Sequence, residues 1–109
     1  MPKDVYPTAT RELAEERKRL APDTLAAFQA FSRQAFADGA LPAMTKQLIA
    51  VAVAHTTQCP YCIRSHTRQA LRAGATREQV MEAIWVAAEM RAGAAYAHAN
   101  IALDAMDET

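Results

Sequence analysis

Apolar residues recur at intervals of three and four along almost the whole chain, and this spacing restricts the fold more than any other feature. Leu25, Phe28, Phe31, Ala35 and Phe36 form one such series. A series of this kind is typical of the buried stripe of an amphipathic α-helix. No segment alternates Val, Ile or Thr with polar residues, as a half-buried strand does. We therefore expect an all-α protein, with the phenylalanine stripe and Trp85 in its core.

Caps and helix breakers divide the chain into about six predicted helices. Pro60 suits a first helical position, Thr76 and Gln79 have the spacing of a capping box, and Gly39 and Gly93 suit a helix end or break. The run 48–54 is apolar on every side, which predicts a central buried helix. The expected helices cover roughly 10–20, 22–38, 43–57, 60–73, 77–92 and 94–106.

Size and charge bound the functions that this chain can have. Its 109 residues fit a single domain, which we expect to span 1–109. Twelve basic residues balance twelve acidic ones, so neither nucleic acid nor an anionic membrane is an expected partner. The N-terminus has no apolar signal-like run, and 48–54 is too short to cross a bilayer. We therefore expect a cytoplasmic protein, in a compartment where thiols stay reduced.

The segment 55–66 combines three features that bear on chemistry. Cys59 and Cys62 are three residues apart and lie at the predicted start of a helix, and His66 follows Cys62 by one helical turn. Unpaired N–H groups and the positive end of the helix dipole stabilise an anion at that position. In a reducing compartment, a cysteine pair of this kind indicates redox chemistry or metal binding.

The same geometry predicts roles for the three residues. A thiolate, and not a thiol, is the attacking species, and both a helix start and a neighbouring imidazole favour it. We assign Cys62 as the nucleophile, His66 as its base or proton shuttle, and Cys59 as the thiol that captures a sulfenic acid on Cys62 as a disulfide. The redox interpretation needs no cofactor and no metal.

The region of about 41–103 resembles the alkylhydroperoxidase D-like branch of the carboxymuconolactone decarboxylase family. The resemblance rests on TKQLIA at 45–50, CPYCxxxH at 59–66, AGAT at 73–76, AIWVAA at 83–88 and RAGAA at 91–95. It implies an all-α fold, assembly into homotrimers or homohexamers, and an antioxidant peroxidase that reduces hydroperoxides. It also implies a dithiol reductant, such as a lipoyl group, and attack on peroxide by the second cysteine of the motif.

One position departs from the family pattern. The resemblance places a glutamate twelve residues before the first cysteine, at the far end of a proton relay, and this chain has Gln47 there. An amide can hold an imidazole by a hydrogen bond but cannot take up its proton. The relay is therefore interrupted or completed by another group. An interrupted relay predicts weak peroxidase activity and a protein that acts mainly as a disulfide oxidoreductase or on an unusual substrate. His55 lies on the same helical line as Gln47, and Glu89 and His98 are further candidates.

Two other functions fit the same residues. The ligands His55, Cys59, Cys62 and His66 form a set that tetrahedral zinc accepts. In a non-redox lyase of the carboxymuconolactone decarboxylase kind, His66 alone would move protons and the thiols would be incidental. The resemblance disfavours the lyase, because that branch typically lacks paired thiols.

Overall fold

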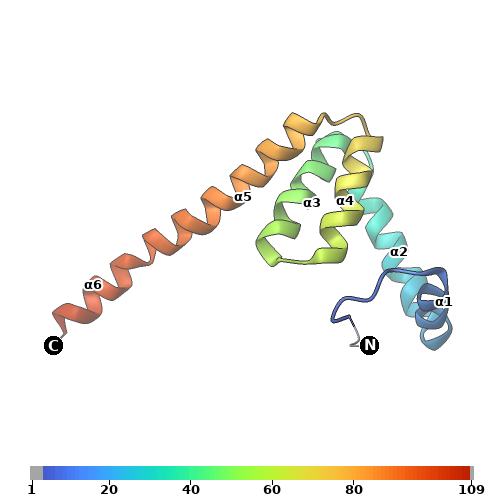
Figure 1. The fold of residues 1–109 in the computed structure, drawn as a ribbon, viewed down its shortest axis with the longest axis horizontal. Helices are drawn as coiled ribbons and strands as arrows, with labels where there is room; N and C mark the ends of the chain where they lie inside the picture. Colours follow the sequence, from blue (N-terminus) through green and yellow to red (C-terminus); the bar gives the residue numbers. More distant parts are fainter. Residues whose placement is uncertain (1–3, 109) are drawn as a thin grey trace. The chain divides into compact units, whose positions relative to one another are not determined.

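Six α-helices make up the fold of residues 4–108, which are the residues that the computed structural model describes (Figure 1). They are α1 (Arg11–Leu20), α2 (Pro22–Phe36), α3 (Ala43–Thr57), α4 (Pro60–Arg72), α5 (Arg77–Ala97) and α6 (Ala99–Asp107). This part of the chain contains no β-strand, so the all-α prediction is confirmed. None of its helices is both long and apolar enough to cross a membrane.

The chain forms two compact units, and the boundary falls inside α3 between Lys46 and Gln47. In the first unit, α1 packs against α2. The hydroxyl of Thr10 caps α1 by accepting a hydrogen bond from the Leu13 amide at 3.3 Å. The carboxylate of Asp38 accepts a hydrogen bond from the Ala43 amide at 2.7 Å, which satisfies one of the free N–H groups at the start of α3.

The predicted end of α2 and its predicted core are both wrong. The helix ends at Phe36, three residues before Gly39, because the following residues turn to bring Asp38 to the start of α3. No residue of α2 is buried, and Phe31 is 67 % exposed. Two helices cannot enclose an aromatic stripe, so Phe28 and Phe31 contact each other at the surface, with ring centroids 6.4 Å apart.

The second unit begins with an antiparallel pair formed by α3 and α4 (Figure 1). Its core is small and consists of Val51, Ala54, Ala70, Ala75, Val80 and Ala87. Contrary to the prediction, α3 is not buried on every side, since Val53 is 53 % exposed and Ile49 is exposed as well. The buried residues of α3 are Gln47, Val51 and Ala54.

Helix α5 starts as the sequence predicts and ends later. The Thr76 hydroxyl accepts a hydrogen bond from the Gln79 amide, and the Gln79 side chain accepts one from the Thr76 amide, so the capping box is present. The predicted break at Gly93 is wrong, because one glycine weakens a helix without ending it. The helix continues to Ala97, and α6 follows after the single residue His98.

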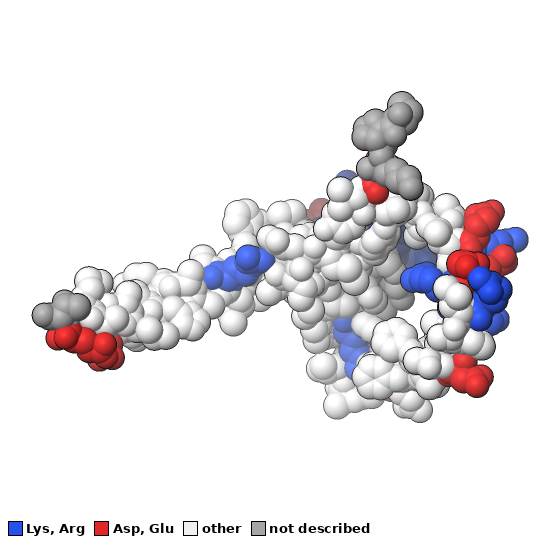
Figure 2. Space-filling model, turned by 90° about the horizontal axis from the view of Figure 1, so that it is seen from below, with Lys and Arg blue, Asp and Glu red and all other residues white. Residues whose placement is uncertain are grey.

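Large apolar side chains remain exposed along α5 and α6. Trp85 is 65 % exposed, in contrast to its predicted place in the core. Consecutive residues of a helix point about 100° apart, so Trp85 and Val86 expose apolar surface on different sides of α5. In Figure 2 the part of the surface formed by these helices carries few charged groups before its acidic end. The exposed apolar residues of α5 and α6 are Met81, Trp85, Val86, Met90, Tyr96, Ile101, Leu103 and Met106.

Candidate functional site

Cys59 lies at the junction of two helices and belongs to the ends of both. Gln58 adopts the left-handed conformation, with φ 57°, and the Cys59 amide donates to the Ala54 carbonyl at 3.1 Å. This is the six-residue hydrogen bond of a Schellman motif, which closes α3. Cys59 is also the N-cap of α4, and its Sγ accepts a hydrogen bond from the Cys62 amide at 3.3 Å. The end of α3 therefore fixes the sulfur at the start of α4.

Pro60 and Cys62 complete the first turn of α4, and the prediction of a cysteine pair at a helix start is confirmed. Pro60 has the helical φ of a first position and lacks an N–H group that the helix could not pair there. Both cysteines are free thiols and both are half-buried. Both side chains therefore reach solvent, where a small substrate can meet them.

The two thiols differ in acidity, in the order opposite to that expected from the sequence. A hydrogen bond from the Cys62 thiol lowers the pKa of Cys59, and a hydrogen bond from the Cys62 amide lowers it further by a smaller amount. The same thiol–thiol hydrogen bond, together with burial, raises the pKa of Cys62. The physical reason is the capping position: Cys59 accepts the free N–H at the helix start, whereas Cys62 supplies it. In the reduced pair, negative charge is favoured on Cys59 and the shared proton on Cys62.

His66 joins α4 to α3 through Gln47. Nδ1 of His66 lies 2.8 Å from Oε1 of Gln47, whose side chain is only 7 % exposed. The sequence prediction names both residues as site residues, and the structure places them in direct contact. Burial lowers the pKa of His66, so its neutral form is favoured near pH 7.

Two further residues extend this network, and the sequence analysis missed both. Nε2 of Gln47 donates to Oε1 of Gln69 at 3.3 Å, and Nε2 of Gln69 donates to the Ser65 hydroxyl at 2.9 Å. The i,i+4 spacing of Ser65 and Gln69 is visible in the sequence, and it is a common helical pair. Their link to Gln47 depends on the packing of α3 against α4, which spacing does not specify.

The other residues considered from the sequence hold different partners. Nδ1 of His55 donates to the Val51 carbonyl at 2.8 Å, one turn back in its own helix. Nδ1 of His98 donates in the same way to the Ala94 carbonyl at 2.7 Å. The Glu89 carboxylate lies over Gly93, with Oε1 3.2 Å from the point that a Cβ there would occupy. None of these contacts joins the network of Gln47 and His66.

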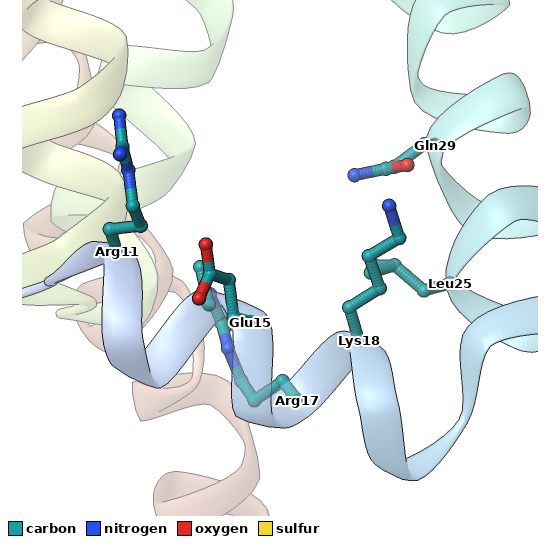
Figure 3. A pocket seen from close by; sticks show the side chains of 7 residues that line it. Arg11, Glu15, Arg17, Lys18, Leu25 and Gln29 are labelled. Carbon is teal, nitrogen blue, oxygen red and sulfur yellow. The ribbon is translucent and has the colours of Figure 1, made fainter.

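A metal site and a small-molecule cavity are the other kinds of site that the described part of the chain could contain. No three side chains of the His, Cys, Asp and Glu types converge there to hold a metal, so the zinc set allowed by the spacing is not assembled. A cavity of about 280 Å³ lies between α1 and α2 in the first unit (Figure 3). Its lining residues are Arg11, Ala14, Glu15, Arg17, Lys18, Leu25 and Gln29, and none belongs to the cysteine site.

Comparison with known proteins places the chain in a family. Residues 22–105 match the carboxymuconolactone decarboxylase family, and the chain belongs to it. The family contains alkylhydroperoxidase-like members, and the resemblance described from the sequence is thus confirmed at the level of the family. The match covers both cysteines and the four residues of the hydrogen-bond network, His66 included.

Individual relatives agree with this assignment. The chain is 72 % identical over 82 residues to uncharacterized protein 4 in the cox locus of Paracoccus denitrificans, a match that covers 75 % of this chain and 74 % of the relative. A carboxymuconolactone decarboxylase family protein from Legionella pneumophila, solved in its apo form, shares 38 % identity with a TM-score of 0.68, over 89 % of this chain and 86 % of that one. A Methanobacterium thermoautotrophicum protein shares 35 % identity with a TM-score of 0.72, over 76 % and 93 %.

Proposed function

We propose that this protein is a thiol-dependent peroxidase that reduces hydroperoxides through a Cys59–Cys62 dithiol/disulfide cycle. The observation that carries the proposal is the hydrogen bond from the Cys62 amide to the Cys59 sulfur at the start of α4. This bond holds the sulfur where a helix stabilises a thiolate, beside a second thiol. Membership of a family with alkylhydroperoxidase-like enzymes supports the same chemistry.

The hydrogen bond from the Cys62 amide to the Cys59 sulfur favours a thiolate on Cys59, and we order the steps from this bond. Cys59 loses its proton to His66, and its thiolate attacks the terminal oxygen of the hydroperoxide. An S–O bond forms, the O–O bond breaks, and Cys59 becomes a sulfenic acid. The alkoxide that leaves takes the proton of Cys62 and departs as an alcohol. Cys59 is thus the attacking thiol and Cys62 the resolving thiol, the reverse of the roles that the sequence analysis assigns.

The second half of the cycle closes the disulfide. The Cys62 thiolate attacks the sulfur of the Cys59 sulfenic acid, an S–S bond forms, and the S–O bond breaks. The hydroxide that leaves takes the proton held by His66 and departs as water. The sulfurs are oxidised by two electrons and the peroxide is reduced by two. A dithiol such as a lipoyl group then attacks the disulfide and restores both thiols through a mixed disulfide. We place this cycle in the cytoplasm, where dithiol reductants are maintained.

We also propose that the working unit is a homotrimer or homohexamer. One copy of the chain leaves large apolar side chains of α5 exposed to solvent, among them Trp85, Val86 and Met90. Large apolar side chains exposed in this number often mark an interface. Copies of the same chain are the occupants that the family resemblance implies.

Mass spectrometry after a pulse of hydroperoxide tests the function. We expect the purified reduced protein to lose two hydrogens, with the loss located to a Cys59–Cys62 bridge, and to recover them with a dithiol. A double Cys59→Ser, Cys62→Ser variant serves as the control and should neither change mass nor consume peroxide. An unchanged wild-type mass would contradict the proposal. Full activity of the double variant on a lactone substrate would favour the lyase instead.

A further inference from the structure

The three hydrogen bonds that connect Ser65, Gln69, Gln47 and His66 have a common direction. Nε2 of Gln69 donates to the Ser65 hydroxyl, and Nε2 of Gln47 donates to Oε1 of Gln69. Each glutamine thus donates toward Ser65 and accepts on its other side. The last oxygen, Oε1 of Gln47, lies 2.8 Å from Nδ1 of His66. No buried side-chain nitrogen or oxygen of the described residues lacks a partner, so this network is satisfied as it stands.

The direction of the chain determines the tautomer of the imidazole. An amide oxygen only accepts hydrogen bonds, so Nδ1 of His66 must carry the proton. A neutral imidazole has one protonated nitrogen, and Nε2 then keeps its lone pair. Burial favours this neutral form. His66 is thereby held as a base, with the basic nitrogen on the side of the ring away from Gln47.

A glutamine at position 47 needs support that a carboxylate does not. Both oxygens of a carboxylate accept, so either one fixes Nδ1–H. An amide that turns by 180° presents NH₂ instead, and it then stabilises the opposite tautomer, with the proton on Nε2. Only the acceptor Oε1 of Gln69, 3.3 Å from Nε2 of Gln47, opposes that turn in this network.

We propose that Gln69 is a positioning residue, which holds the Gln47 amide with its oxygen on Nδ1 and so keeps His66 in the tautomer that accepts a proton at Nε2. Ser65 anchors Gln69 from the preceding turn of α4. The catalytic consequence rests on the function proposed above, whereas the tautomer itself does not. Gln69 is a positioning residue because its hydrogen bonds join Gln47 and Ser65, so that it acts on His66 through Gln47.

Two substitutions at position 69 separate the acceptor from the shape of the side chain. Gln69→Met keeps the length and removes the acceptor, and Gln69→Glu keeps an acceptor for Nε2 of Gln47. We expect ¹⁵N NMR of the reduced protein to give Nδ1 a protonated-type shift and Nε2 an unprotonated-type shift in the wild type and in Gln69→Glu. In Gln69→Met the tautomer ratio should move toward Nε2–H by about fivefold, the usual weight of one hydrogen bond.

Kinetics provide the second readout. The maximal rate of peroxide reduction should fall by about the same factor in Gln69→Met, at all pH values above the pKa of His66, and should be largely restored in Gln69→Glu. Ser65→Ala should move both readouts in the same direction by less. Arg68→Met, an exposed change on the same helix, is the matched control and should move neither.

The two readouts distinguish failure of this inference from failure of the proposed function. If the wild type consumes no peroxide but Gln69→Met still shifts the tautomer, the positioning role holds and the peroxidase is wrong. If Gln69→Met and Ser65→Ala both keep a single Nδ1–H tautomer and a wild-type pH profile, the positioning role is overturned. Should Gln69→Met fail to fold, Ser65→Ala and Gln69→Glu decide the question by the same spectra.

Discussion

The two thiols of the CxxC motif have different physical environments, although only two residues separate them. Cys59 receives the amide that α4 leaves free at its start, and Cys62 is inside the first turn. A cap position stabilises charge more directly than a place within the turn, because its side chain accepts the N–H itself. The capping hydrogen bond therefore favours negative charge on the first cysteine of the motif and lowers the pKa of that thiol.

Alkylation of the reduced protein tests this difference at the residue scale. We expect iodoacetamide to modify Cys59 several times faster than Cys62 at neutral pH, because the alkylation rate follows the thiolate fraction. The rate at Cys59 should reach half its maximum at a pH below the ordinary pKa of a cysteine. Peptide mapping by mass spectrometry measures both rates. Faster modification of Cys62 would contradict the assignment.

His66 should make stability depend on pH. Burial lowers its pKa in the folded state below the ordinary value of 6.5, so the unfolded chain binds the proton more readily. The contribution of His66 to the free energy of unfolding is complete above pH 6.5 and is lost as the pH falls through the lower folded pKa. Urea unfolding should therefore show that the wild type is less stable at pH 5 than at pH 7. The same drop in pH should lower the free energy of unfolding of His66→Gln by less. Equal losses would argue against a buried neutral imidazole.

At the scale of elements, the junction between α3 and α4 is the feature that positions the site. Gln58 occupies the left-handed region, which favours glycine, and this conformation lets the Cys59 amide close α3 while its sulfur opens α4. Arg91 of α5 adds a contact here, because its guanidinium donates to the Thr56 carbonyl at 2.7 Å. A cation suits the negative end of the α3 dipole.

A glycine at position 58 should stabilise the protein. The left-handed conformation costs a side chain about 1–2 kcal/mol, and the extra freedom of an unfolded glycine offsets part of that gain. We expect Gln58→Gly to raise the free energy of unfolding by about 0.5–1 kcal/mol. The matched change is Gly74→Ala, at φ 101°, which should lower it. Denaturant titration of both variants measures the two effects, and a loss of stability in Gln58→Gly would refute the argument.

The helices could be predicted from the sequence wherever a cap has a specific chemistry. Pro60 and the Thr76–Gln79 capping box gave correct helix starts. Gly39 and Gly93 gave wrong helix ends, because a glycine permits a break without requiring one. The cap formed by Asp38 on Ala43 fixed the first boundary. The His66–Gln47 pair was predicted through the family resemblance, but the Gln69 link depends on how two helices pack.

At the scale of the whole molecule, several residues that the sequence predicts to be core, Trp85 among them, are exposed in a single copy of the chain. The sequence correctly marks Trp85 as an apolar position, yet periodicity cannot tell burial within one chain from burial between chains. A chain of this size builds a small core, and association buries more apolar surface. The same argument applies to the exposed Phe28 and Phe31 of α2.

Light scattering coupled to size exclusion should therefore give a mass three or six times the chain mass of 11.9 kDa. A charge in place of one of the exposed apolar residues should weaken the assembly, because burial of an unpaired carboxylate is costly. We expect Trp85→Glu to shift the protein toward smaller species, and Glu78→Gln, an exposed change in the first turn of α5, to leave it unchanged. A monomeric wild type would contradict the proposed assembly.

The most direct test of the central claim is the trapping of a sulfenic acid in single-cysteine variants after a pulse of hydroperoxide. In Cys62→Ser the resolving thiol is absent, so we expect a dimedone-type probe to label Cys59 rapidly. In Cys59→Ser the remaining thiol, Cys62, is not at the N-cap and does not accept the capping hydrogen bond at the helix start. We therefore expect the probe to label Cys62 slowly or not at all. Rapid labelling of Cys62 would reverse the roles, and absence of labelling in both variants would contradict peroxide chemistry at this site.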